Sequence, residues 1–262
     1  KYVPHKSLDI PNDLAPQNLW FMFEGPVLEH DVIAYRFYGE HRHRSDIYAK
    51  SVTDLVMDTV GWDYHNIMDW GSDVLKVGNS LGIGSPAIWY QDSLYTFSDY
   101  KQKNISILEN SDQKASIRFS MKEIKIGAEV LDIIHDWSIE SGQYFTTNTI
   151  SITKGTLPEN AFFATGIVKH LEQIETGNTN GDFFAYNWGK QSFHKENLGM
   201  AILIPETLEP EKIENDLSHV YLFKNAKTTI NYAFLAAWER GENGVSDVTT
   251  FKDVIATACE QF

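Results

Sequence analysis

Residues 130–153, VLDIIHDWSIESGQYFTTNTISIT, carry the pattern that decides the fold. Apolar and polar side chains alternate over residues 130–139 and again over residues 144–153. A period of two residues is typical of a β-strand with one buried face. The intervening Glu140-Ser141-Gly142-Gln143 has the composition of a short turn. Two long strands joined by such a turn form a β-hairpin, so the sequence predicts one here.

The same alternation recurs on both sides of this hairpin. It is clear at residues 33–38 and 117–122, and further strands are predicted at residues 162–170, 198–204, 220–223 and 229–239. Because the links between these strands are too short for repeated crossover helices, the sheets should be antiparallel. The sequence therefore predicts an all-β fold, a large antiparallel β-sandwich that forms a single domain over residues 1–262.

The two ends of the chain depart from the strand pattern. Residues 1–17 contain three prolines, which predicts an irregular strap over the domain. At the other end, Thr250 and Asp253 form a capping-box-like start to a short C-terminal helix. The apolar side chains that recur at helical spacing after this start are Phe251, Val254, Ala258 and Phe262.

Composition limits the classes of partner. A formal net charge of -14 argues against a nucleic-acid partner, because neutralising phosphates requires clustered Lys and Arg. No run of about 18 apolar residues occurs, so no membrane span is expected. The single cysteine, Cys259, excludes an internal disulfide. Because the sequence starts at Lys1 rather than Met, we expect that a signal peptide was removed and that the protein is periplasmic or secreted.

The stretch HRHRSDIYAK at residues 41–50 concentrates positive charge in this acidic chain. If it is extended, one side carries His41, His43 and Ser45, and the other carries Arg42, Arg44, Asp46, Tyr48 and Lys50. Arginines on such a ridge could hold a substrate carboxylate while a Tyr or His moves a proton. The alternative is a solvated edge strand with ion pairs. The two histidines also permit a divalent metal, but no third ligand is evident, so the cofactor stays unknown.

A second cluster follows at residues 64–79. His65 and Asp69 could form a base and the carboxylate that orients it, and Trp70 could stack on a pyranose ring. The alternative is a structured loop whose Trp packs in the core and whose Asp caps backbone amides. Lys76 and Asn79 follow within reach of the same loop.

A third group is scattered along the predicted strands. Its members are His135, His170, Trp188, Gln191 and Trp238. Individually, a histidine in a strand is more often structural than catalytic. Together these residues could line a groove with the aromatic platforms and few polar groups that a sugar site needs. No His-Glu-x-x-His motif and no papain-like cysteine context occur, so hydrolysis by those routes is not supported.

Two runs resemble a family of unknown-function domains from bacterial polysaccharide-utilisation loci, where they occur beside unsaturated-uronyl hydrolases. The first run is Tyr38-Gly39-Glu40-His41-Arg42 leading to Asp46-Ile47-Tyr48 and Lys50; the second is Tyr64-His65 with Asp69-Trp70-Gly71-Ser72-Asp73-Val74-Leu75-Lys76-Val77-Gly78. Weaker matches at Lys169-His170, Trp188-Gly189 and Ala236-Ala237-Trp238-Glu239 extend the resemblance over most of the chain. The segment His43-Arg44-Ser45 is more basic than this family leads us to expect.

The resemblance implies a galactose-mutarotase-like β-sandwich and the activity of an ulvan oligosaccharide dehydratase. Such an enzyme removes water from the non-reducing-end uronic acid of an acidic oligosaccharide. On this view Arg42, helped by Arg44, neutralises the carboxylate, Tyr48 and His65 act as base and acid, and Asp69 orients His65. His170 is a further catalytic candidate. The substrate-binding candidates are His43, Arg44, Lys50, Tyr64, Trp70, Lys76, Asn79, His135, Trp188, Gln191 and Trp238.

Three other functions remain open at this point. A polysaccharide lyase runs the same elimination with a sugar as leaving group, and an epimerase would leave the substrate mass unchanged. A non-catalytic carbohydrate-binding module would need the tryptophans but not the titratable groups beside the arginines.

Overall fold

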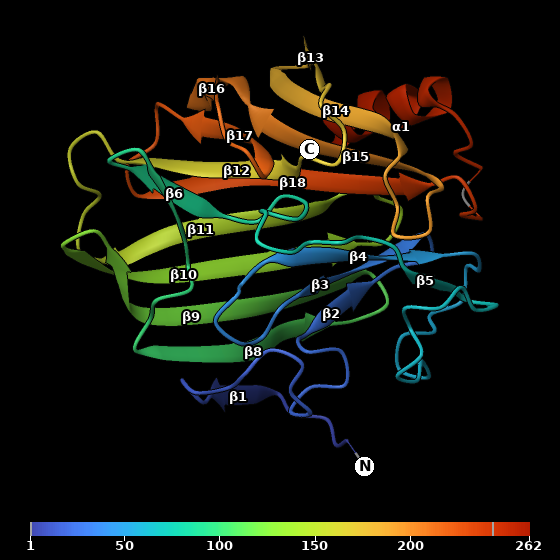
Figure 1. Cartoon of the computed structure of the whole chain (residues 1–262), viewed down its shortest axis with the longest axis horizontal. Coiled ribbons are helices and arrows are strands. Elements are labelled where there is room, and N and C mark those ends of the chain that lie inside the picture. The colour runs from blue at the N-terminus through green and yellow to red at the C-terminus, as the bar shows by residue number, and fades with distance from the viewer. Residues whose placement is uncertain (1, 243) are drawn as a thin grey trace.

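The computed structural model describes residues 2–242 and 244–262, so Lys1, the first residue of the predicted strap, lies outside the described residues. Within these ranges the chain forms three β-sheets and one C-terminal α-helix (Figure 1). The pairings between named strands are antiparallel. The prediction of an all-β antiparallel sandwich with a C-terminal helix is confirmed. No helix in the described ranges has the length and apolar character needed to cross a membrane.

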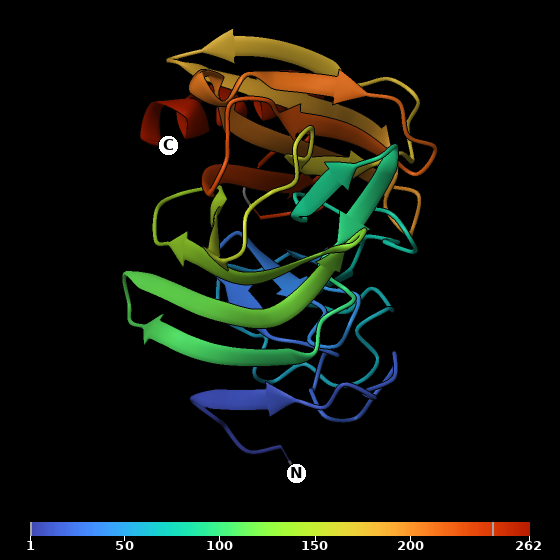
Figure 2. The same cartoon turned by 90° about the vertical axis from the view of Figure 1, so that its left-hand side faces the viewer.

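A nine-stranded sheet forms the largest layer of the molecule. In spatial order its strands are β1 (Ser7–Ile10), β8 (Gln102–Asn110), β9 (Lys114–Ile126), β10 (Glu129–Glu140), β11 (Thr146–Lys154), β18 (Thr229–Trp238), β15 (Asn197–Pro205), β14 (Asp182–Lys190) and β13 (Glu175–Thr179). The predicted hairpin is the β10–β11 pair, in which Trp137 lies opposite Asn148. Figure 2 shows that its long strands, green at residues 102–140, curve into a bent layer.

Two smaller sheets pack near this layer. A four-stranded sheet contains β2 (Val27–Glu29), β3 (Ile33–Phe37), β4 (Ser45–Lys50) and β5 (Gly71–Asp73). A five-stranded sheet contains, in spatial order, β16 (Pro210–Ile213), β17 (Ser218–Phe223), β12 (Phe162–Val168), β6 (Ala87–Tyr90) and β7 (Ser93–Thr96). In Figure 1 the blue strands β2 to β4 lie in front of the green strands β8 to β10. A one-turn 3-10 helix, η1 (Glu206–Leu208), precedes β16.

Alternation along β3 decides which residues enter the core. Tyr35 and Phe37 face the nine-stranded sheet, where their rings lie 5.1 Å from Phe234 and 4.8 Å from Trp137, respectively. Because side chains alternate in a strand, Arg36 must point to the other face. That second face packs against Phe23 and against Met57, Val60 and Tyr64 of the segment 51–70, and it becomes part of the candidate site.

Both ends of the chain differ in part from the prediction. The strap is not irregular throughout, because Ser7–Ile10 forms β1 and pairs with β8 at the sheet edge. The helix α1 spans Val248–Gln261, and its N-cap is Asp247 rather than Thr250. The Asp247 carboxylate accepts hydrogen bonds from the backbone N–H groups of Thr249 and Thr250, so it satisfies donors that have no partner within the helix.

Candidate functional site

Arg36 is the centre of a buried hydrogen-bond network on the outer face of the four-stranded sheet. Its Nη1 donates to the Tyr48 hydroxyl at 2.7 Å and to the Phe23 carbonyl at 2.8 Å. Its Nη2 donates to the Tyr38 hydroxyl at 2.9 Å and to the Asp46 carboxylate. Burial alone would lower the pKa of Arg36, but its anionic and phenolic neighbours raise it well above the ordinary value. The guanidinium therefore stays charged inside the protein.

Two carboxylates share this guanidinium. Asp46 lies opposite Arg36 in the β3–β4 register, and Asp73 Oδ2 lies 3.6 Å from Arg36 Nη2. Burial raises the pKa of Asp46, and the negative charge of Asp73 raises it further, while Arg36 lowers it. Close buried carboxylates with a perturbed pKa are common at functional sites, although structural ion-pair networks also produce them.

His65 connects this buried network to the surface. Its Nδ1 lies 3.3 Å from Asp73 Oδ2, and its side chain is 59% exposed. The hydrogen bond to Asp73 raises the pKa of His65, against the lowering effect of burial. With Nδ1–H donating to the carboxylate, Nε2 is the nitrogen that can exchange a proton with a bound molecule. The neighbouring Tyr64 ring centroid is 4.4 Å away, and Tyr64 is buried.

The carboxylate beside His65 corrects the sequence-based expectation. Asp69 is exposed, and its backbone carbonyl accepts a hydrogen bond from Ser51 Oγ at 2.7 Å. It lies in the turn that precedes β5, where Met68 and Gly71 exchange backbone hydrogen bonds. Asp73, at the end of β5, occupies the orienting position instead.

Tyr48 lies too deep to touch a substrate in this structure. It is fully buried, its ring centroid lies 5.6 Å from that of Tyr64, and its hydroxyl accepts the hydrogen bond from Arg36. Burial raises the pKa of Tyr48 well above the ordinary value. Tyr48 therefore supports Arg36, and the expectation that it acts as base or acid is not supported by its position.

The predicted cationic ridge at residues 41–50 does not form. β4 begins only at Ser45, and His43 has a φ of 40°, which breaks the extended pattern. Arg42 is held by the carboxylates of Glu24 and Glu40, so its charge is already neutralised. Arg44 Nη1 instead donates to the Gly78 carbonyl at 2.8 Å.

Lys50 also differs from its predicted role as a substrate-binding residue. Its side chain is buried on the same face as Asp46. Its Nζ donates to the His30 carbonyl at 2.7 Å and lies 3.0 Å from Glu29 Oε1. Both contacts occupy the ammonium group inside the protein, so it cannot reach a substrate in this structure.

His43 and His135 correct a further expectation, because both lie in the core between the sheets. His43 Nε2 lies 3.0 Å from His135 Nδ1, and His135 Nε2 lies 2.7 Å from Asn148 Oδ1. Burial lowers the pKa of His43 well below its ordinary value and that of His135 to about 3. Both are therefore neutral core residues and do not bind substrate. In residues 2–242 and 244–262, no group of three His, Cys, Asp or Glu side chains could hold a metal ion.

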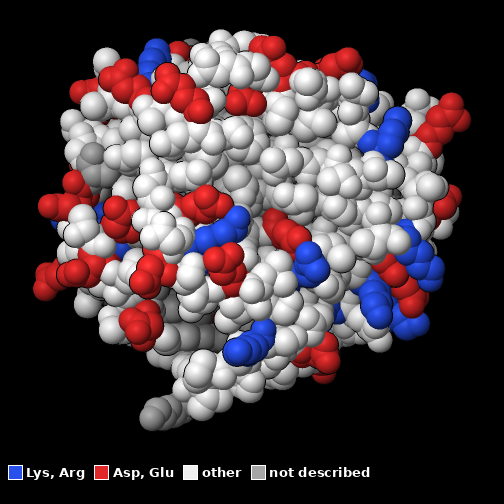
Figure 3. All heavy atoms as spheres, turned by 180° about the vertical axis from the view of Figure 1, so that it is seen from behind, with Lys and Arg blue, Asp and Glu red and all other residues white. Residues whose placement is uncertain are grey.

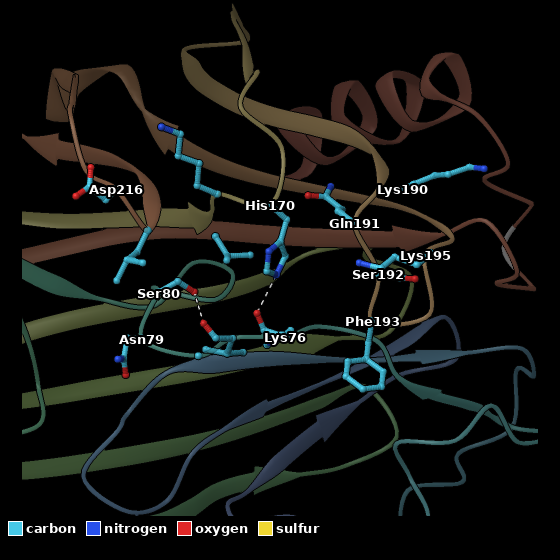
Figure 4. A pocket seen from close by; sticks show the side chains of 15 residues that line it. Lys76, Asn79, Ser80, His170, Lys190, Gln191, Ser192, Phe193, Lys195 and Asp216 are labelled. Atoms are coloured by element: carbon cyan, nitrogen blue, oxygen red, sulfur yellow. Dashed lines mark hydrogen bonds between the residues drawn. The ribbon is translucent and has the colours of Figure 1, made fainter.

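A cavity of about 610 Å³ opens where segments from all three sheets meet (Figure 4). Its walls come from residues 76–80, 168–170, 190–195 and 216–217. Four residues that the sequence predicted for the site line it, namely Lys76, Asn79, His170 and Gln191. The lining also contains Lys169, which adjoins His170, and the polar and aromatic residues that the sequence-based prediction missed, namely Ser80, Lys190, Ser192, Phe193, Lys195 and Asp216. Four of the missed residues lie in the run 190–195, but the contact of this run with residues 76–80 and 216–217 exists only in the folded chain, so no local motif could have grouped the whole lining.

Hydrogen bonds between segments fix the cavity walls. His170 Nε2 donates to the Lys76 carbonyl at 2.8 Å, and the Phe193 N–H donates to the Val74 carbonyl at 2.7 Å. Gln191 Nε2 donates to Asn187 Oδ1 at 2.8 Å and to the Leu198 carbonyl at 2.7 Å. The walls are thus preorganised by contacts that do not depend on a bound molecule.

The cavity lining is positively charged although the protein is strongly acidic. Its charged lining consists of Lys76, Lys169, Lys190, Lys195 and a single carboxylate, Asp216, whereas the whole chain carries a net charge of -14. From behind, Asp and Glu are spread over the surface and many Lys and Arg lie directly beside them (Figure 3). The cavity therefore has the local charge that an anionic ligand requires.

Phe193 links the cavity to His65. Its side chain lines the cavity, and its ring centroid lies 6.3 Å from the His65 ring centroid. The next residue, His194, places Nε2 3.0 Å from Ser72 Oγ on β5. The candidate site therefore comprises the His65–Asp73 pair and, beyond Phe193, the cavity that we call the lysine pocket.

Comparison with known proteins places the chain in a family. Residues 1–262 match the family described as "Domain of unknown function (DUF4861)". The chain belongs to the DUF4861 family. This confirms the part of the predicted resemblance that concerns a family of unknown-function domains; the likeness to ulvan dehydratases stays a prediction. No curated protein sequence matches this family member.

A solved structure with a partly similar arrangement is a variant of the GH36 α-galactosidase AgaA from Geobacillus stearothermophilus in complex with raffinose. It shares 8% sequence identity at a TM-score of 0.36, and the match covers 81% of this chain. The DUF4861 chain spans only 40% of that structure's length. A similarity this low carries no conclusion about activity.

The predicted tryptophans of this DUF4861 protein do not gather at one surface. Trp70 is partly buried and lies over Tyr48, with the ring centroids 6.4 Å apart. Trp188 is also partly buried and lines a different cavity, of about 430 Å³, together with Tyr186. Trp238 is buried and cannot stack on a sugar, which corrects its predicted role as a substrate-binding residue.

Proposed function

We propose that this protein is an oligosaccharide dehydratase. It eliminates water from the non-reducing-end uronic acid of ulvan-type oligosaccharides and leaves an unsaturated uronyl residue. The observation that carries the proposal is an exposed His65 held by buried Asp73, next to the lysine pocket of an acidic protein. We further propose a periplasmic or secreted location, where such oligosaccharides would be met.

The elimination needs one group that takes a proton and one that returns it to the leaving hydroxyl. His65 Nε2 takes the proton from the carbon next to the carboxylate. The released electron pair forms the C=C bond as the C–O bond to the neighbouring hydroxyl breaks, and that oxygen leaves as water with the proton from Nε2. One residue performs both transfers when the proton and hydroxyl lie on the same face of the sugar. Asp73 stabilises the imidazolium formed in between.

The carboxylate of the substrate must be neutralised for its neighbouring proton to become acidic. Arg42 and Arg44, the sequence-based candidates, are engaged with Glu24, Glu40 and the Gly78 carbonyl. The cationic groups that remain are those of the lysine pocket, whose lining residue Phe193 lies beside His65.

Two observations favour an enzyme over a simple binding module. His65 is 59% exposed while the Asp73 that orients it is buried, so its second ring nitrogen can reach a bound molecule. A binding module would need its tryptophans as an exposed platform, whereas the three that the sequence predicted for binding are partly buried (Trp70 and Trp188) or buried (Trp238). Proton transfer at His65 uses the exposed position that binding alone would not require.

The deciding experiment incubates the protein with saturated oligosaccharides that end in a uronic acid. We expect enoate absorbance to rise and the mass to fall by one water while the chain length is kept. Shorter products would favour the lyase alternative, and unchanged absorbance and mass would contradict elimination of either kind. His65→Ala should lower kcat/KM by about 10²–10⁴-fold. The matched control is His41→Ala, which removes another exposed histidine.

A further inference from the structure

The lysine pocket is offset from the proton-transfer nitrogen. Its lining includes Phe193 but neither His65 nor Asp73. A group bound in the pocket is therefore separated from the reacting carbon by the Phe193 side chain. The volume of about 610 Å³ falls in the range of small-molecule sites and exceeds what one carboxylate occupies.

We propose that Lys76 and Lys195, which line the same cavity as His170, bind a second anionic group of the substrate. This group is a sulfate ester or a carboxylate on the sugar next to the reacting uronate. The inference rests on the proposed function for the position of the reacting sugar, but the pocket's affinity for an anion can be measured without turnover.

These two lysines are selected by their positions around His170. The positive charges of Lys195 and Lys76 both lower the pKa of His170, after the larger effect of burial. In Figure 4 the Lys195 side chain ends on the side facing His170, whereas Lys190 points away from it. Lys169 Nζ lies 3.1 Å from Glu172 Oε2 and is thereby partly neutralised. Within the described part of the chain, Lys76 and Lys195 have no ion pair.

The contacts of His170 favour its neutral imidazole, with the proton on Nε2. Its Nε2–H donates to the Lys76 carbonyl, and its lowered pKa keeps the imidazole neutral at neutral pH. Nδ1 is then an acceptor, which can take a hydrogen bond from a sugar hydroxyl. Lysine ammonium groups are compact donors that bind sulfate or carboxylate oxygens as point charges.

Nearby carboxylates are held in positions that keep them from neutralising the charges of Lys76 and Lys195. Glu196 follows Lys195 directly, but its carboxylate accepts from Trp238 Nε1 at 3.0 Å and from Arg240 Nη1 at 3.0 Å. It also accepts from Ser192 Oγ at 3.2 Å. These contacts hold Glu196 against β18 and offset its charge. Asp216 lies on the opposite wall from Lys195 in Figure 4.

The test is calorimetric binding to the full chain carrying His65→Ala, so that turnover does not consume the ligand. Three oligosaccharides share a terminal uronate, and the next sugar carries a sulfate ester, a carboxylate or neither. We expect at least one of the two anionic ligands to bind about tenfold more tightly than the neutral one. The tighter of the two identifies the source of the anion.

Single substitutions then locate the site. Lys76→Gln or Lys195→Gln should remove most of the preference for the anionic ligand and reduce the salt dependence of its Kd. Both side chains are exposed, so folding should survive, and an unfolding curve checks it. Lys190→Gln is the matched control, because it removes the same charge from the pocket lining, at the end of β14, but the Lys190 side chain points away from His170.

Three outcomes would overturn the assignment: equal affinity for all three ligands, an unchanged preference in Lys195→Gln and Lys76→Gln, or an equal loss in Lys190→Gln. The last would mean that only net charge matters. If binding prefers the anionic ligand and this preference depends on the two lysines, but the wild-type protein shows no turnover, the anion site is supported and the dehydratase activity is rejected. Turnover without any preference would retain the dehydratase and reject the anion site.

Discussion

His65 Nδ1 lies 3.3 Å from Asp73 Oδ2, and the same carboxylate oxygen lies 3.6 Å from Arg36 Nη2. Asp73 thus joins an exposed imidazole to a buried guanidinium. Because Arg36 is fixed by four further hydrogen bonds, the carboxylate that orients His65 cannot rotate freely. A preorganised base of this kind avoids the cost of reorientation during proton transfer.

The first prediction concerns this contact. Asp73→Asn should lower the pKa of His65, because the hydrogen bond to the carboxylate is the largest cause that raises it. We also expect kcat/KM to fall by about tenfold or more, as when an orienting carboxylate is replaced in a catalytic triad. Titration of the His65 ring protons by NMR measures the first effect directly.

The control for this prediction is Asp69→Asn. Asp69 is exposed and lies in the same loop, but no contact joins its side chain to His65 among the described residues. An Asp69→Asn variant with the same loss as Asp73→Asn would return the orienting role to Asp69, as the sequence alone predicted.

The second prediction is the pH dependence of the elimination. His65 must be neutral to take a proton, and its pKa is raised above 6.5. We therefore expect kcat/KM to rise with pH through a value above 6.5, and this acid limb to move to lower pH in Asp73→Asn. An acid limb at the same pH in both proteins would show that another group is the base.

The same shift gives a stability effect of defined sign. A raised folded-state pKa adds stability below the unfolded pKa, and this stability is lost as pH rises through the folded pKa. The difference in unfolding free energy between wild type and Asp73→Asn should therefore shrink above the pKa of folded His65. Because His65 is largely exposed, solvent screening keeps this effect small.

The fold could be predicted from the sequence where the signal was local. The β10–β11 hairpin follows from alternation and one turn, both contained in residues 130–153. His43 shows the limit, because a single residue at φ 40° ends the extended pattern that the prediction continued to His41. The residue types around His43 do not indicate that this residue adopts a positive φ.

The candidate site was predictable only in part, for a similar reason. The His65 loop was found because titratable and aromatic residues are dense there. Arg36 was not predicted as a site residue, because alternation over residues 33–38 does not say which residues cover the face opposite Tyr35 and Phe37; that depends on tertiary packing. The lysine pocket depends on Lys195 and Lys76 meeting across separate segments, so only the folded chain shows it.

The third prediction tests the assignment of His135 to the core. His135→Ala should lower the unfolding free energy by about 2–5 kcal/mol, the range for removing a large buried side chain. The pKa of His135 is lowered from 6.5 to about 3, so the unfolded state binds more protons between these values. Wild-type stability should therefore fall as pH falls from 6.5 toward 3.

The measurement is urea denaturation at neutral pH and at pH values below 6.5. In His135→Ala the acid-induced loss should be smaller, because the buried imidazole that must be protonated is absent. An oligosaccharide KM that rises in a fully folded His135→Ala protein would contradict the core assignment and favour a role in binding.

The fourth prediction concerns Gly71, which starts β5 and so sets the position of Asp73. A Cβ at Gly71 would lie 1.9 Å from the Ala49 carbonyl oxygen, and the φ of 134° is one that L side chains rarely adopt. Gly71→Ala must therefore push β5 away from β4, where Asp73 pairs with Tyr48. We expect a loss of about 3 kcal/mol or more in unfolding free energy and a lowered His65 pKa.

Gly142→Ala separates backbone strain from the displacement of β5. Gly142 has a φ of 81° in the β10–β11 turn, and a Cβ there would meet no atom within 4 Å. This variant should lose only about 1–2 kcal/mol and keep the wild-type His65 pKa and activity. If Gly71→Ala behaved in the same way, the position of β5 would not control the His65–Asp73 contact. A larger loss for Gly71→Ala, together with a lower His65 pKa, would instead show that the close approach of β4 and β5 holds Asp73 in place.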